Sequence, residues 1–165
     1  MTARMIDGWL FVLTLVTAIA CGLVAGFFFA FSTTVMKAFA RLPGPHGLAA
    51  MQSINVVVIN PLVMTALFGT AVACAVLVVA ALVNWGEAYA VYLLVGGLLY
   101  LAGVVVLTIV YHVPRNEALT ALDSNQAGAV DHWHRYARSW TAWNHVRTVA
   151  PIAAATLLTI SLRVS

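Results

Sequence analysis

Charged residues are scarce in this sequence: only 8% of its 165 residues are Asp, Glu, Lys or Arg, whereas 63% are hydrophobic. With a mean hydropathy of +0.98, the chain cannot cover a soluble core with polar surface. This composition excludes a soluble globular protein and makes a lipid bilayer the expected solvent. We expect one transmembrane domain over residues 1–165, with no separate extramembrane catalytic module.

Cysteine patterns and basic runs are also missing. The two cysteines, Cys21 and Cys74, lie in the middle of apolar runs without CxxC spacing, which excludes a disulfide framework. The eight Lys and Arg residues are scattered, without the basic run that nucleic acid or a cluster of anionic lipid headgroups would need. We therefore expect no nucleic-acid partner and read the net charge of +3 as information about membrane orientation.

Apolar runs of membrane-spanning length are present instead. They predict four transmembrane helices, over residues 9–36, 54–83, 89–112 and 145–162. The second can begin near residue 54 or at Asn60–Pro61, with Asn60 as the N-cap and Pro61 as the first helical residue. The sequence thus predicts an all-α integral membrane protein, built as a four-helix bundle.

Two polar connections complete the predicted fold. Residues 37–52 contain RLPGPHG, whose prolines and glycines predict a loop. Residues 117–144 carry most of the acids and bases and predict an interfacial amphipathic helix between the third and fourth spans. Both connections lie on the same face of the membrane, because four consecutive spans alternate in direction.

The cations are concentrated on that face. The opposite face carries only Arg4 and Arg163, whereas the polar face has Lys37, Arg41, Arg115, Arg135, Arg138 and Arg147. The positive-inside rule therefore places the polar face in the cytoplasm.

A stripe of polar and aromatic residues precedes the fourth span. Its members recur at helical spacings of three or four: Trp133, Tyr136, Trp140, Trp143, Asn144 and Arg147. The tryptophans alone are equally typical of an interfacial aromatic belt. Arg147 favours a functional role, because a guanidinium one turn inside an apolar span needs a polar partner or a water-filled cavity.

His112 ends the third span, and Asn116 falls on the same helical face one turn later. An imidazole at this place suits proton abstraction, although a histidine solvated at the membrane edge is the alternative. Asn60 adds an amide that can donate and accept hydrogen bonds. The five histidines show no HxxxH or HxxE spacing, so a metal or haem is not favoured but remains open.

Several motifs together resemble the anthrone oxygenase-like membrane proteins. They are GLVAGFFFAFSTTVMKAFARLP at residues 22–43, Asn60–Pro61, HVPRN at 112–116 and WTAWNHVRT at 140–148. The resemblance covers nearly the whole chain and implies a four-helix membrane bundle in a bacterial plasma membrane. For the polyketide enzymes of the group it implies oxidation of an anthrone to an anthraquinone by dioxygen, without an obvious cofactor. The functional residues it implies are His112, Asn116, Trp140, Asn144 and Arg147, with Asn60 beside them.

The resulting hypothesis is a cofactor-independent membrane oxygenase or oxidase for a planar phenolic, anthrone-like or quinol substrate, with dioxygen as co-substrate. His112 would remove a proton, and Arg147 would stabilise the anion that reacts with dioxygen. The residues expected to contact the substrate in a cavity between the helices are Asn60, Asn116, Trp140, Trp143 and Asn144. Lys37, Arg41, Arg135 and Arg138 are expected to be solvated surface and orientation signals.

Two other classes of protein fit the same residues. One is a non-catalytic membrane protein that binds a quinone or lipid, or that serves as an accessory subunit of a larger complex or homo-oligomer. The other is a metal-dependent membrane oxidoreductase. Proton-coupled transport is less favoured, since the predicted spans contain no buried acid. The expected partners are the lipid bilayer and a hydrophobic aromatic small molecule.

Overall fold

A computed structural model describes residue 6 and residues 8–43, 45–123 and 126–164 of the chain. Within these residues the regular elements are helices, four of which are π-helical turns (η1–η4). In chain order they are α1 (Gly8–Ala30), η1 (Phe31–Val35), α2 (Met36–Ala40), α3 (His46–Val57), α4 (Pro61–Met64), η2 (Thr65–Gly69), α5 (Thr70–Val83), α6 (Ala90–Tyr100), η3 (Leu101–Val106), η4 (Thr108–His112), α7 (Val113–Thr120) and α8 (Ala129–Ser161).

Consecutive elements join into long apolar helices. Three of these, Gly8–Ala40, Pro61–Val83 and Ala90–Thr120, are long and apolar enough to cross a membrane. The chain is therefore equipped as a membrane protein. The fourth predicted span, now the second half of α8, is not among the three. Its apolar sequence is diluted by Asn144, His145 and Arg147.

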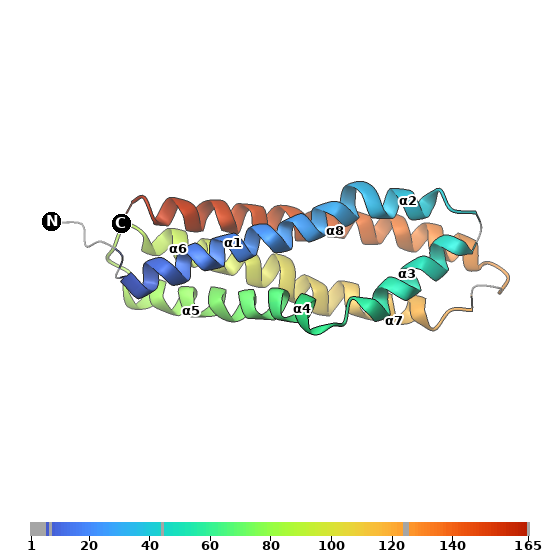
Figure 1. The fold of residues 1–165 in the computed structure, drawn as a ribbon, viewed down its shortest axis with the longest axis horizontal. Helices are drawn as coiled ribbons and strands as arrows, with labels where there is room; N and C mark the ends of the chain where they lie inside the picture. The colour runs from blue at the N-terminus through green and yellow to red at the C-terminus, as the bar shows by residue number, and fades with distance from the viewer. Residues whose placement is uncertain (1–5, 7, 44, 124–125, 165) are drawn as a thin grey trace.

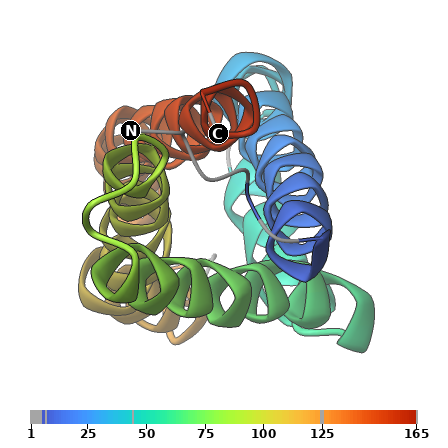
Figure 2. The same ribbon diagram turned by 90° about the vertical axis from the view of Figure 1, so that its left-hand side faces the viewer.

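The long helices lie side by side (Figures 1 and 2). Helix α1 packs along α8, α5 packs along α6, and α6 also packs against α8, with further contacts between α1 and α5. The beginning of α1 and the end of α8 lie at the same end of the molecule, whereas α3, α7 and the first turns of α8 gather at the other.

Two buried hydrophobic clusters follow the length of this assembly. The first, here called the apolar core, joins α1, α5, α6 and the last turns of α8 and includes Cys21, Cys74, Leu77, Leu93 and Tyr100. The second, here called the aromatic core, lies toward α3 and α7 and includes Leu48, Met51, Trp133, Tyr136 and Trp140.

The connection after the first helix is shorter than predicted. The helix continues to Ala40, and α3 begins at His46, so residues 41–45 alone connect them. The prediction of a loop over residues 37–52 is wrong at both ends. Pro45 is the N-cap residue of α3, and a proline is tolerated there because the first residues of a helix need no intrahelical N–H bond.

Of the two starts that the sequence allows for the second apolar helix, the structure has the one at Pro61. Helix α3 ends at Val57, and Asn60 has an extended backbone (φ −129°, ψ 157°). Its Oδ1 accepts a hydrogen bond from the Val63 backbone N–H at 3.1 Å. Asn60 is therefore an N-cap, followed by proline at the first helical position.

The third apolar helix does not end at residue 112. It passes through the π-helical turn η4 and through Pro114, and it continues as α7 to Thr120. Pro114 has no N–H to donate, but it lies in the first turn after η4, where the hydrogen-bond ladder is already shifted. The predicted boundary at residue 112 is therefore too early.

Helix α8 is continuous over 33 residues, although an interfacial helix ending at residue 144 is predicted. Residues 117–120 belong to α7 and residues 129–144 to α8, so the structure has neither a separate interfacial segment nor a boundary at residue 144. Pro151 lies inside α8, where it leaves the Arg147 carbonyl without its helical donor but does not end the helix.

Candidate functional site

Arg147 is a buried cation between the two cores. Its side chain is only 4% exposed. Nη2 donates a hydrogen bond to Asn144 Oδ1 at 2.8 Å, and Nη1 donates to Thr108 Oγ1 at 3.4 Å. The buried Nε has no hydrogen-bond partner, and no carboxylate among the described residues pairs with the guanidinium. Burying a charge without an opposite charge is costly, so the protein keeps an uncompensated positive charge here.

Two aromatic rings flank the guanidinium. Arg147 Cζ lies 4.4 Å from the ring centroid of Phe28 and 4.9 Å from that of Trp140. Such cation–π contacts stabilise a cation but do not neutralise it. The ring faces also give the site flat apolar walls, which suit a planar aromatic molecule.

Asn144 holds Arg147 in place. Its side chain is fully buried, and its Nδ2 donates to the Phe28 carbonyl at 2.9 Å and to Ser32 Oγ at 2.7 Å, while Oδ1 accepts from Arg147. Ser32 Oγ lies 3.3 Å from Thr148 Oγ1. The amide is thus fixed by the first helix and can present the guanidinium in one orientation.

His112 is fully buried at the end of η4. Its Nδ1 lies 3.3 Å from the Leu107 carbonyl, and its Nε2 is buried without a hydrogen-bond partner. In the tautomer that carries its proton on Nδ1, Nε2 keeps a free lone pair and can accept a proton. The imidazole meets Trp140 edge to face, with ring centroids 5.3 Å apart. Trp140 therefore contacts both His112 and Arg147.

Asn116 fixes Trp140 from the other side. Its Oδ1 accepts hydrogen bonds from Tyr136 Oη at 2.8 Å and from Trp140 Nε1 at 3.1 Å. Burial raises the pKa of the Tyr136 phenol above its ordinary value, against smaller lowering effects of Asn55 and Arg147, so the hydroxyl stays protonated and donates. Asn116 thus acts on its aromatic neighbours.

The structure brings together five of the seven predicted site residues: His112, Asn116, Trp140, Asn144 and Arg147. It does not bring the other two to them. Asn60 bonds within its own segment, since its Nδ2 also donates to the Val57 carbonyl at 3.0 Å. Trp143 is 45% exposed and packs on Tyr111, with ring centroids 5.0 Å apart.

Four further contributors are not among the predicted site residues: Phe28, Ser32, Thr108 and Thr148. The hydroxyl residues Ser32, Thr108 and Thr148 carry a weak signal, because each interrupts an apolar run. Phe28 contributes its backbone carbonyl and its ring face, and no sequence pattern distinguishes it from the other phenylalanines of α1.

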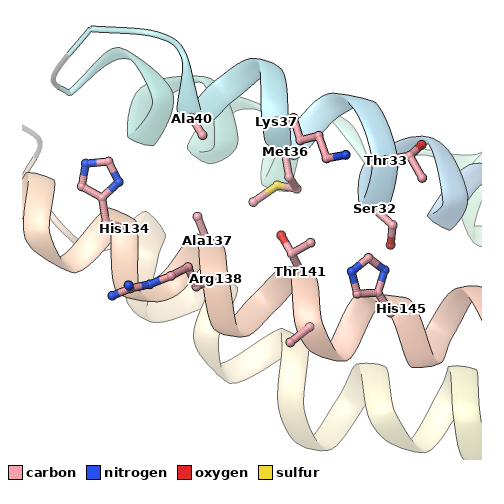
Figure 3. Close-up of a pocket in the computed structure, with 11 residues that line it drawn as sticks. Ser32, Thr33, Met36, Lys37, Ala40, His134, Ala137, Arg138, Thr141 and His145 are labelled. Atoms are coloured by element: carbon pink, nitrogen blue, oxygen red, sulfur yellow. The ribbon is translucent and has the colours of Figure 1, made fainter.

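The site residues are tightly packed. His112 and Asn144 have no exposed surface, and neither of the two surface grooves described for the protein is lined by any of the five residues. A groove of about 650 Å³ between the end of the first helix and α8 reaches Ser32, the partner of Asn144 (Figure 3). In the described part of the chain, no group of three or more His, Cys, Asp or Glu residues is placed to hold a metal ion.

Comparison with known proteins identifies the group to which these residues belong. Residues 61–157, more than half of the chain, match the family described as anthrone oxygenase. The matched range contains the five assembled residues and excludes Asn60 and all of α1. No curated protein and no solved structure shows significant similarity to the chain. The match over most of the chain, centred on this buried cluster, shows that the protein belongs to the anthrone oxygenase family.

Proposed function

We propose that the protein is a membrane-embedded oxygenase that acts on a planar phenolic, anthrone-like or quinol substrate. One observation carries this proposal. Arg147, a buried cation without a carboxylate partner, and His112, a buried imidazole with a free Nε2, both contact the ring of Trp140. Such a pair suits a substrate that loses a proton and becomes an aromatic anion.

The first step is proton removal. His112 Nε2 accepts a proton from the acidic C–H of an anthrone-like carbon acid, or from the O–H of a phenol, and becomes an imidazolium. The electron pair left behind is delocalised onto the substrate oxygen, and Arg147 stabilises this negative charge. A guanidinium in a water-excluded site is much more effective at this than in water.

The second step is reaction of the anion with dioxygen. The carbanion transfers an electron to dioxygen, and the two radicals combine into a peroxide at the same carbon. Loss of a water molecule then turns the former CH₂ into a carbonyl, so one oxygen atom enters the product and the other leaves in water. The proposal names no metal or flavin, because the anion of an anthrone or hydroquinone is itself an electron donor.

The proposed setting is a four-helix membrane bundle, in which the second half of α8 is the fourth span. About 20 residues cross the hydrocarbon core, and counting back from Ser161 reaches Ala142. Arg147 would then lie more than one turn inside the bilayer, where a cation needs a functional reason. The distribution of Lys and Arg favours a cytoplasmic location for the α3–α7 end in a bacterial plasma membrane.

The test is oxygen consumption by the purified protein in detergent, with anthrone and a set of hydroquinones as substrates. His112→Ala should lower the rate by about a thousandfold, because general-base catalysis contributes on this order. His132→Ala, which changes an exposed histidine of α8, is the matched control and should keep the activity. Full activity of His112→Ala would remove His112 as the base.

A second candidate function is binding without turnover, as a quinone- or lipid-binding protein or an accessory subunit. It is favoured by the same cation–π site, which can hold an anionic aromatic without any proton transfer. Quenching of Trp140 fluorescence by an anthraquinone, combined with no oxygen uptake on any substrate, would support it. Stoichiometric metal or a haem absorption band in the active protein would instead support a metal-dependent oxidoreductase.

A further inference from the structure

We propose that the groove between the end of the first helix and α8 binds the headgroup of an anionic phospholipid. The groove has a volume of about 650 Å³ and lies between η1–α2 on one side and α8 on the other (Figure 3). This size is within the range of small-ligand sites. The proposal rests on the membrane location of the protein and not on its oxygenase activity.

The lining of the groove is basic at its edges. Lys37, His134, Arg138 and His145 all line it, and no Asp or Glu does. In Figure 3, His134 and Arg138 lie toward one end and Lys37 and His145 toward the other. These residues are far apart in the sequence, so the basic site forms only because η1–α2 packs against α8.

The floor of the groove is mostly apolar. Met36, Ala40, Ala137 and Ala142 supply most of this surface, and Figure 3 shows Met36 and Ala137 between the two basic ends. A phospholipid has the matching pattern, with an anionic phosphate next to a glycerol and the first methylenes of its acyl chains. Basic pockets between transmembrane helices bind such headgroups.

The position along α8 fits the headgroup layer. If the hydrocarbon core ends near Ala142, Arg138 lies about one helical turn beyond it and His134 about two turns beyond it. Lys37 follows the apolar part of the first helix, and Figure 3 shows its side chain extending toward Thr33, back toward the bilayer core. This is the direction in which an ammonium reaches for a lipid phosphate from outside.

Charge selects among the lipids that a bilayer offers. A phosphatidylglycerol headgroup is negative and carries no cation, so Lys37 and Arg138 can both approach its phosphate. The trimethylammonium of phosphatidylcholine would lie next to the same basic residues and be repelled. The site should therefore prefer phosphatidylglycerol over phosphatidylcholine with identical acyl chains.

The experiment is native mass spectrometry of the full-length protein in detergent, titrated with dioleoyl phosphatidylglycerol or dioleoyl phosphatidylcholine. The double variant Lys37→Gln, Arg138→Gln should bind phosphatidylglycerol roughly 30-fold more weakly, because each basic residue contributes about tenfold or slightly less. The matched control is Arg41→Gln, Arg135→Gln, which removes two exposed cations at the same end but outside the groove. It should change binding by about twofold or less.

A third variant keeps every charge. Ala137→Phe places a ring over the floor of the groove and should also reduce phosphatidylglycerol binding, even if the charge variant does not fold. An equal loss in the Arg41 and Arg135 control would show diffuse surface attraction and overturn the proposal. Equal binding of the two lipids would overturn it as well, and so would displacement of the lipid by an excess of inorganic phosphate. None of these readouts depends on turnover, so they separate this proposal from the oxygenase proposal.

Discussion

The same helices pass through two buried regions that treat polar groups in opposite ways. In the apolar core the Tyr100 hydroxyl donates to the Leu67 carbonyl at 2.9 Å, and Thr70 Oγ1 donates to the Ala66 carbonyl at 2.6 Å. In the site, Arg147 Nε and His112 Nε2 are buried without partners. The apolar core also has one such atom, Thr14 Oγ1, but a neutral hydroxyl costs far less to bury than a guanidinium.

This difference separates stability from function along one set of helices. In the apolar core, packing is complete and each polar group but one serves the backbone of its own fold. At the site, hydrogen-bonding capacity is retained although no group of the described protein uses it, and this is expected where a ligand completes the interactions. Substitutions in the two regions should therefore affect different measurements.

The largest effect is expected for Arg147→Met. Loss of the cation should lower oxygen consumption on anthrone by about a thousandfold, equivalent to about 4 kcal/mol of transition-state stabilisation. The apparent unfolding temperature in detergent should stay the same or rise, because an unpaired buried charge is replaced by an apolar chain of similar length. Cys21 and Cys74, both buried and free, allow this temperature to be followed with a thiol-reactive fluorophore during heating.

Arg163→Met is the control for this experiment, since it removes an exposed cation at the other end of α8. It should leave both the rate and the unfolding temperature unchanged. A strong loss of stability in Arg147→Met with normal activity would reverse the assignment and make the guanidinium a structural group.

A smaller effect, in stability, is expected for Leu77→Ala in the apolar core. Leu77 has no exposed surface, and its truncation leaves a cavity that should cost about 2 kcal/mol of unfolding free energy. This is at the low end for such changes, because a lipid environment supplies little hydrophobic driving force between helices. Leu82→Ala, on the exposed side of the same helix, should have almost no effect. Activity measured well below the unfolding temperature should be normal in both variants; a specific loss of activity in Leu77→Ala would break the division between the regions.

The smallest effect is expected for Asn60→Ala, which removes an N-cap and should cost about 1 kcal/mol of stability. Asn60→Ser replaces one good N-cap by another and should restore the stability. The predicted contact of Asn60 with the substrate is tested by the same pair, through the KM for anthrone. If Asn60→Ser restored stability but kept a raised KM, the substrate contact would be supported.

Much of the fold follows from the sequence because it depends on local properties. Apolar runs of sufficient length predict the three long helices, and the Asn60–Pro61 pair predicts a helix start that the structure contains. The errors lie at proline residues. Pro45, Pro114 and Pro151 each suggest an end of a helix, but the first lies at an N-cap, the second follows a π-helical turn and the third interrupts one hydrogen bond only. These outcomes depend on the surrounding packing and cannot be read from the proline itself.

The site could be predicted where side chains lie on one helix. Trp140, Asn144 and Arg147 share a face of α8, so their spacing alone places them together. The contacts made by the first helix could not be predicted, because Phe28 acts through its carbonyl and Ser32 through a distant amide. The basic groove was missed for the same reason. Lys37 and Arg138, expected to be ordinary solvated surface, become neighbours only through packing of segments 100 residues apart.

The π-helical turn η4 has a consequence for the evolution of the family. Each residue of a helix advances it by about 100°, so a single-residue deletion that converts η4 to a regular α-helical turn would rotate everything after it by about this angle relative to what precedes it. His112 and Asn116 would leave the face that meets Trp140, whereas the apolar part of the helix before η4 would keep its packing. Members of the family that keep the chemistry should therefore conserve the number of residues in this turn more strictly than the identity of its apolar side chains.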